Sequence, residues 1–97
     1  MSIETSEKKE NKPLFLIMQE YWFNEIAEGR KDIEYRNDTD FYRSRLMTKD
    51  GKFRNYDSVI MQVGYNKNAK RMQIEINKII LDDDFEIYLG KILDKNF

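Results

Sequence analysis

The segment 29-GRKDIEYR-36 concentrates side chains that can bind a charged or polar ligand. Lys31 and Arg36 are cations, and Glu34 lies between them. A planar guanidinium donates two parallel hydrogen bonds to a phosphate or a base edge, and a carboxylate accepts from an exocyclic amine. These residue types favour recognition of a phosphate or a nucleobase. The alternative is a solvated strand edge, whose charges pair with one another and contribute little.

A second segment, 41-FYRSRLM-47, interleaves aromatic and arginine side chains. Aromatic rings stack on bases and arginines neutralise phosphates, whereas Phe41 and Leu46 are expected in the core. Two residues that flank a predicted hairpin loop are expected to line the same cleft. The further candidates for ligand binding are Tyr42, Arg43 and Arg45 from this segment, and Tyr65 and Arg71 from the hairpin.

The sequence contains no cysteine and no histidine. Disulfides, thiolate nucleophiles, histidine-dependent triads and histidine zinc ligands are therefore excluded. Asp, Glu, Lys, Tyr, Thr and Ser remain as possible catalysts. The run 82-DDD-84 predicts a solvated acidic turn, because three consecutive residues on a turn cannot all converge on one cation. We expect neither a metal nor a cofactor.

Charge is distributed unevenly along the chain. Residues 30–71 hold 11 Lys and Arg against 6 Asp and Glu, a balance of +5 within a total of −1. This excess fits a cationic face that attracts phosphate, although uneven placement of charges by chance is an equal alternative. No apolar run approaches the length of about 20 residues that spans a membrane, and the N-terminus lacks the apolar core of a signal peptide. We expect a cytoplasmic protein that binds RNA, a nucleotide or a nucleoside and does not contact a membrane.

A chain of 97 residues forms one domain. Residues 1–13 are polar and without periodicity, which predicts a disordered leader before a domain over residues 14–97. The apolar run 14-LFLIM-18 predicts a strand buried on both faces. Over residues 20–29 the apolar period changes to three or four, which predicts a helix that ends at Gly29. Its predicted packing face consists of Trp22, Phe23, Ile26 and Ala27.

The remaining elements are predicted mainly as strands. Alternation over 33–36 places Ile33 and Tyr35 on one face and Glu34 and Arg36 on the other. Residues 41–47 fit a short helix or an irregular edge, after a turn at 37–40. Strands are predicted over 58–65 and 71–81, joined by a hairpin loop at 66–70, and over 85–93. Five strands and one N-terminal helix indicate an α+β fold, a small mixed β-barrel or half-barrel with the helix packed on it.

These elements and residues together resemble the ASCH domain, a family of the PUA-like superfamily. The resemblance rests on an apolar strand and a short helix followed by G-x-K-x-x-E-x-R, present here as Gly29, Lys31, Glu34 and Arg36. It is supported by Gly64-Tyr65 at the end of a strand, by Lys70-Arg71 after a turn, and by the closing segment Leu89 to Ile92. It covers about residues 14 to 93. The resemblance implies a PUA-like barrel with a charged cleft between helix and barrel that receives the ligand.

The family is known for binding RNA or nucleotides, and some small bacterial members remove the acetyl group from N4-acetylcytidine with a lysine, a threonine and a glutamate. Lys31 matches that lysine, but Glu34 stands where those hydrolases carry threonine. A non-catalytic binding module is therefore favoured. The alternatives are a small amidohydrolase acting on an acylated nucleoside, with Lys31 and Glu34 as its catalytic residues, and a module that binds another protein.

Overall fold

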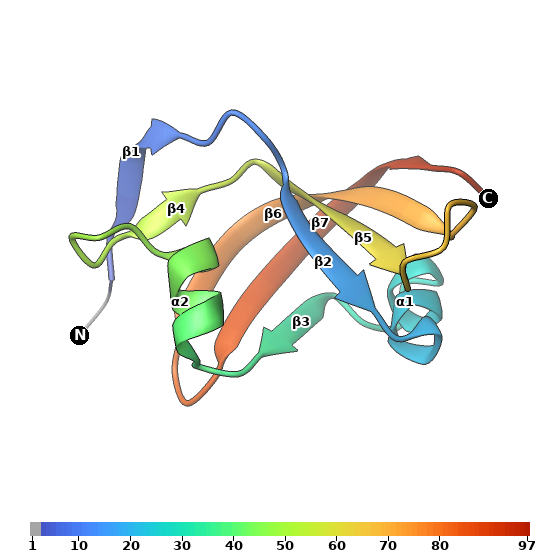
Figure 1. The fold of residues 1–97 in the computed structure, drawn as a ribbon, viewed down its shortest axis with the longest axis horizontal. Helices are drawn as coiled ribbons and strands as arrows, with labels where there is room; N and C mark the ends of the chain where they lie inside the picture. The colour runs from blue at the N-terminus through green and yellow to red at the C-terminus, as the bar shows by residue number, and fades with distance from the viewer. Residues whose placement is uncertain (1–2) are drawn as a thin grey trace.

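The computed structural model in Figure 1 describes residues 3–97 as a small α+β domain with two helices. Within residues 3–97, nine elements follow one another. They are β1 (Thr5–Lys9), β2 (Leu14–Met18), α1 (Glu20–Ala27), β3 (Ile33–Arg36), α2 (Asp40–Leu46), β4 (Phe53–Asn55), β5 (Ser58–Val63), β6 (Arg71–Leu81) and β7 (Phe85–Lys95).

Five strands form a curled mixed sheet in the order β2-β5-β6-β7-β3. The pair β2 and β5 is parallel, and the other three pairs are antiparallel. The hairpin predicted for β5 and β6 is confirmed, with Ser58 opposite Glu75 and Gln62 opposite Arg71. The long strands β6 and β7 cross the back of the view in Figure 1, while β2 and β3 form the two edges of a half-barrel.

The core fills the inside of this half-barrel. On β2, Leu14, Leu16 and Met18 are buried, because alternate side chains of a strand point to the same face. Phe15 lies on the opposite face and is exposed. The prediction that this strand is buried on both faces is therefore wrong, since β2 is an edge strand with only one covered face.

Helix α1 buries Phe23 and Ile26 against the sheet. It ends as predicted at the glycine, because Gly29 has a φ of 80°, a backbone conformation that side chains with a Cβ rarely adopt. Trp22, which was predicted to be part of the packing face, is exposed instead. In an eight-residue helix, the arc that contains Phe23 and Ile26 is enough to cover the neighbouring strands, and Trp22 lies beside it.

The structure contains three elements that were not clearly predicted. Residues 40–46 form α2, whose first turn is capped by the Thr39 hydroxyl accepting from the Tyr42 amide at 3.2 Å. Strands β1 and β4 pair in parallel as a separate two-stranded sheet. The expected disordered leader, residues 1–13, thus differs from the structure from residue 3 onward, because β1 lies within that segment; residues 1 and 2 lie outside the described residues. Backbone pairing to β4 orders this polar stretch, and Ile3 packs on the core.

Strand β3 buries its charged face rather than its apolar one. Glu34 is buried, whereas Tyr35 on the opposite face is exposed. The register of β3 with β7, in which Glu34 lies opposite Ile87, fixes this orientation. The acidic turn at 82–84 is exposed between β6 and β7, as predicted. None of the helices in residues 3–97 has the length and apolar character needed to cross a membrane.

Candidate functional site

The loop after α1 and the strand β3 form one wall of a pocket of about 570 Å³, and α1 forms the other. We call it the motif pocket, because residues 30–35 of the segment 29–36 contribute most of its lining. The complete lining is Trp22, Glu25, Arg30, Lys31, Asp32, Ile33, Glu34 and Tyr35.

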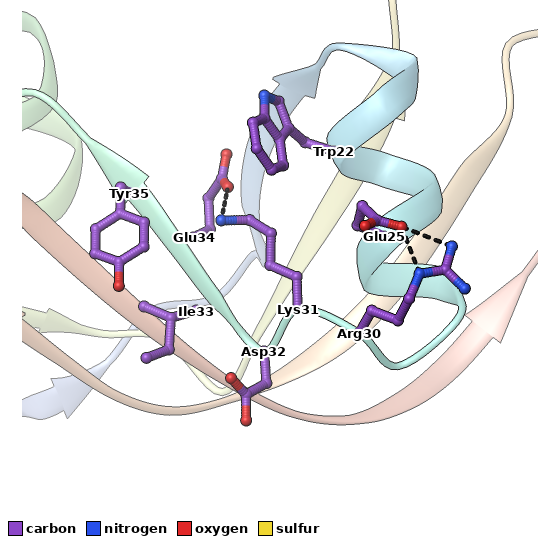
Figure 2. Close-up of a pocket in the computed structure, with 8 residues that line it drawn as sticks. All are labelled: Trp22, Glu25, Arg30, Lys31, Asp32, Ile33, Glu34 and Tyr35. Carbon is purple, nitrogen blue, oxygen red and sulfur yellow. Dashed lines mark hydrogen bonds and ion pairs between the residues drawn. The ribbon is translucent and has the colours of Figure 1, made fainter.

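Lys31 lies at the centre of the motif pocket. Its ammonium is 5.2 Å from the ring centroid of Trp22 and 4.9 Å from that of Tyr35, so it interacts with both rings. Figure 2 shows Trp22 reaching in from α1 and Tyr35 lying on the other side of Lys31. As residues, Trp22 and Tyr35 are 45% and 51% exposed. Each therefore keeps ring surface available to a ligand.

Glu34 connects this lysine to an arginine. Its Oε1 lies 3.5 Å from the Lys31 ammonium, and its Oε2 accepts from Nη2 of Arg36 at 2.8 Å and from Nε at 3.1 Å. The exposed fractions of the Glu34 and Arg36 side chains are only 9% and 15%. A charge pair this far from water is maintained only when further hydrogen bonds satisfy both groups.

Arg36 has those further bonds. Nη1 donates to the Tyr42 hydroxyl at 2.7 Å, and Nη2 lies 3.0 Å from the carbonyl oxygen of Ile17 and 3.1 Å from the sulfur of Met18. Tyr42 belongs to α2 and Ile17 to β2. Arg36 thus links β3 to the other edge strand of the half-barrel, across a gap that no backbone pairing closes.

A second hollow of about 300 Å³ lies beyond this link, and we call it the arginine pocket. Its lining combines two arginines with four aromatic residues and contains no carboxylate. Arg45 rests with its guanidinium 4.4 Å from the ring centroid of Phe41, and Tyr65 is 86% exposed. The lining consists of Phe15, Leu16, Ile17, Arg36, Phe41, Tyr42, Arg45 and Tyr65.

The eight candidate residues are divided among three places. Lys31 and Glu34 line the motif pocket, and Arg36, Tyr42, Arg45 and Tyr65 line the arginine pocket. The other two lie outside both pockets. Arg43 pairs with Asp38 at 2.6 Å, and Arg71 donates to Gln62 at 2.6 and 2.9 Å. The single cleft expected from the sequence is therefore two hollows joined by the Glu34–Arg36 pair.

The Arg43–Asp38 ion pair on the surface lowers the pKa of its carboxyl group. The hydrogen bonds from Arg43, which stabilise the charged carboxylate, hold the pKa of Asp38 below its ordinary value. Arg43 is thus occupied by an acid of its own chain, whereas Arg45 forms no ion pair within the part of the chain that the structure describes.

Four aromatic residues of the pockets are absent from the candidates that the sequence indicates. The sequence patterns predict buried positions for Trp22 and Phe15 and a core position for Phe41, and they place Tyr35 on the same strand face as Ile33. All four are exposed and line one of the two pockets. Only tertiary packing distinguishes them from the buried aromatic residues, because Phe23 and Phe85 are of the same chemical type and are fully buried.

The motif pocket offers a cation, a carboxylate and two ring faces, and the arginine pocket offers cations and ring faces alone. The first set can pair with a hydrogen-bonding planar group, and the second can receive an anion beside an aromatic group. No match to this chain was found among protein-family models, curated proteins or solved structures.

Proposed function

We propose that this protein is a non-catalytic module that binds RNA, a nucleotide or a nucleoside, and that the motif pocket receives a nucleobase. One observation carries the proposal: the half-exposed rings of Trp22 and Tyr35 lie on either side of a lysine–carboxylate pair in a pocket. Base stacking on an aromatic ring is worth about 1–3 kcal/mol.

Lys31 and Glu34 can add hydrogen bonds to this stacking, and hydrogen bonds distinguish one base from another. The Lys31 ammonium donates to a ring nitrogen, a carbonyl or a phosphate oxygen, and Glu34 accepts from an exocyclic amine. The ammonium is carried on a flexible four-carbon stem, so it can turn from one ring to a ligand. A volume of about 570 Å³ is within the range of small-molecule sites, roughly 300–1,000 Å³.

The motif and the order of elements support a PUA-like fold of the ASCH type. Gly29, Lys31, Glu34 and Arg36 follow a strand and a short helix, and the pocket opens between that helix and β3. This is the location that the resemblance implies for the ligand.

The amidohydrolase alternative receives less support. A general base gains and loses a proton in each turnover, whereas a carboxylate shared by two cations serves as a fixed hydrogen-bond acceptor. In Glu34, one oxygen faces Lys31 and the other accepts twice from Arg36. The threonine of the hydrolytic relatives is replaced by this same glutamate. Recognition without covalent chemistry fits these contacts better.

Trp22 is the only tryptophan in the sequence, so its fluorescence reports directly on the motif pocket. We expect quenching when each of the four ribonucleoside 5′-monophosphates is titrated, with a preference for one base. The variant Lys31→Ala should weaken the preferred nucleotide about tenfold, the effect of losing one charge-assisted hydrogen bond. Lys49→Ala is the matched control, because it removes the same charge from an exposed turn outside the pocket.

Calorimetry on the same variants separates binding from a local change of fluorescence. Equal affinities of the wild type and Lys31→Ala, or no binding of any nucleotide at millimolar concentration, would remove the proposal.

A further inference from the structure

The arginine pocket differs from the motif pocket in charge. The motif pocket has two cations and three carboxylates in its lining, so it carries a formal charge of −1. The arginine pocket has Arg36 and Arg45 and no carboxylate in its lining, a formal charge of +2, of which the charge of Arg36 is paired with Glu34 and that of Arg45 is not. A bound anion is therefore favoured more strongly in the second hollow than in the first.

Only one of these two arginines has its head group available. Arg36 is committed to Glu34, Tyr42 and the carbonyl of Ile17. The guanidinium of Arg45 has the ring of Phe41 beside it, and within residues 3–97 no carboxylate lies within ion-pair distance. Its fork of donors is suited to a phosphate.

The aromatic residues around Arg45 present ring surface as well. Phe15, Phe41 and Tyr65 are all exposed, and they come from β2, α2 and the turn after β5. A cation among exposed rings is the combination by which single-stranded nucleic acids are held, with the phosphate on the cation and the base on a ring. An aliphatic anion would leave these rings without a partner.

The carboxylate of Glu34 connects the two pockets. Glu34 lines the motif pocket with one oxygen on Lys31, and its other oxygen holds Arg36, which lines the arginine pocket. Figure 1 shows β3 running from the α1 side of the molecule to the α2 side, so consecutive residues of this strand serve both hollows. Adjacent sites of this kind suit adjacent units of one ligand.

We propose that the ligand is a single-stranded oligonucleotide of at least two nucleotides. The motif pocket takes one base, Arg45 binds the phosphate that links it to its neighbour, and the neighbouring base stacks on Tyr65, which is the most exposed aromatic residue of the arginine pocket. This inference rests on the proposed function of the motif pocket, but the residues that carry it are different ones.

The test compares a mononucleotide with the 5′-phosphorylated dinucleotide of the same base, for all four bases, by calorimetry. We expect the wild type to bind the dinucleotide at least tenfold more tightly. Arg45→Ala should weaken the dinucleotide about tenfold and leave the mononucleotide unchanged. It should also reduce the slope of log K against log salt by about 0.7, the value for one phosphate contact on a single strand.

Two control variants separate the effects of the Arg45 charge and the Tyr65 ring from those of any charge or hydroxyl lost nearby. Arg43→Ala removes an equal charge from the same helix, but from an arginine that is paired with Asp38 outside both pockets, and should leave the dinucleotide advantage intact. Tyr65→Ala should weaken the dinucleotide roughly 5- to 150-fold, whereas Tyr65→Phe keeps the ring face and should bind like the wild type.

The outcomes separate the two proposals. A dinucleotide advantage that survives in both Arg45→Ala and Tyr65→Ala overturns this inference and leaves the motif pocket standing. Arg45-dependent dinucleotide binding that Lys31→Ala and Trp22→Ala leave unchanged removes the proposed function of the motif pocket and supports the phosphate site. Binding of an acidic, tyrosine-containing peptide through Arg45, with no dinucleotide binding, overturns the inference in favour of a protein partner.

Discussion

Arg36 and Arg45 line the same pocket, yet their surroundings differ. Arg36 is 15% exposed and donates to a carboxylate, a hydroxyl and a backbone carbonyl. Arg45 is exposed and contacts the face of one aromatic ring. The first arginine joins two strands that no backbone bond connects, and the second is free to meet a ligand. The number of partners inside the chain, rather than position in a pocket, distinguishes a structural cation from a binding one.

The largest expected effect of any single substitution is on the stability of the Arg36→Ala variant. Removal of this side chain leaves Glu34 buried next to a single, more distant cation, and it opens the link between β2 and β3. Loss of one partner from a buried ion pair destabilises a protein by about 3–5 kcal/mol. Chemical denaturation should report a decrease in unfolding free energy of this size.

Arg45→Ala is the control for Arg36→Ala, because an exposed arginine is worth about 0–1 kcal/mol. Arg36→Lys should fall between the two, since an ammonium keeps the charge but cannot reproduce the planar fork that reaches three partners at once. Similar unfolding free energies for Arg36→Ala and Arg45→Ala would contradict the distinction between the two arginines.

Glu34→Gln should have the next largest effect. The amide keeps the shape of the side chain and one acceptor, but it removes the charge that Lys31 and Arg36 share. Hydrogen bonds to charged groups contribute about 1.5–3 kcal/mol, so we expect destabilisation at the lower end of this range. The same denaturation measurement checks it, with Glu86→Gln as a control. Glu86 accepts from the Tyr88 hydroxyl and forms no ion pair within the described residues. A more stable Glu34→Gln protein would mean that the cations do not need this carboxylate.

Much of the fold was predictable because its main elements have clear hydrophobic periods. The alternation of Met72 and Ile74 with polar residues predicted β6, and the spacing of Phe23 and Ile26 predicted α1. Strands β1 and β4 lack such a pattern. Thr5–Lys9 is polar along its whole length, so its order depends on backbone pairing with a segment about 50 residues away.

The candidate site, like the fold, was predictable only where a local sequence pattern determines the structure. Local alternation correctly placed Glu34 and Arg36 on the same face of β3, but it could not indicate that this face points into the half-barrel. That outcome depends on the pairing of β3 with β7 and on the position of β2 opposite, both long-range contacts. The burial of Trp22 was predicted wrongly because the apolar spacing in α1 does not define where the packing face ends. Only Phe23 and Ile26 are buried in this helix. The ligand-binding roles of all these residues stay predictions.

The smallest expected effect concerns the surface pair of Asp38 and Arg43, and it is visible as a pH dependence. The pKa of Asp38 is lowered in the folded protein by its hydrogen bonds from Arg43, so the pair adds stability above the ordinary carboxyl pKa. The contribution of the pair to the unfolding free energy is lost as the pH falls through the lowered pKa of Asp38 in the folded state. We expect the unfolding free energies of the wild type and Asp38→Asn to differ between pH 5 and 7, and this difference to shrink progressively as the pH falls below about 4, the ordinary carboxyl pKa. In an Arg43→Ala background, Asp38→Asn should have no such pH-dependent effect. A difference between wild type and Asp38→Asn that stays constant as the pH falls below the ordinary carboxyl pKa would mean that the carboxylate charge is not the source of the coupling. The ion pair of Arg43 with Asp38, at 2.6 Å, would then contribute less than its geometry indicates. Arg43→Ala would then no longer be a valid control for Arg45→Ala in nucleotide binding.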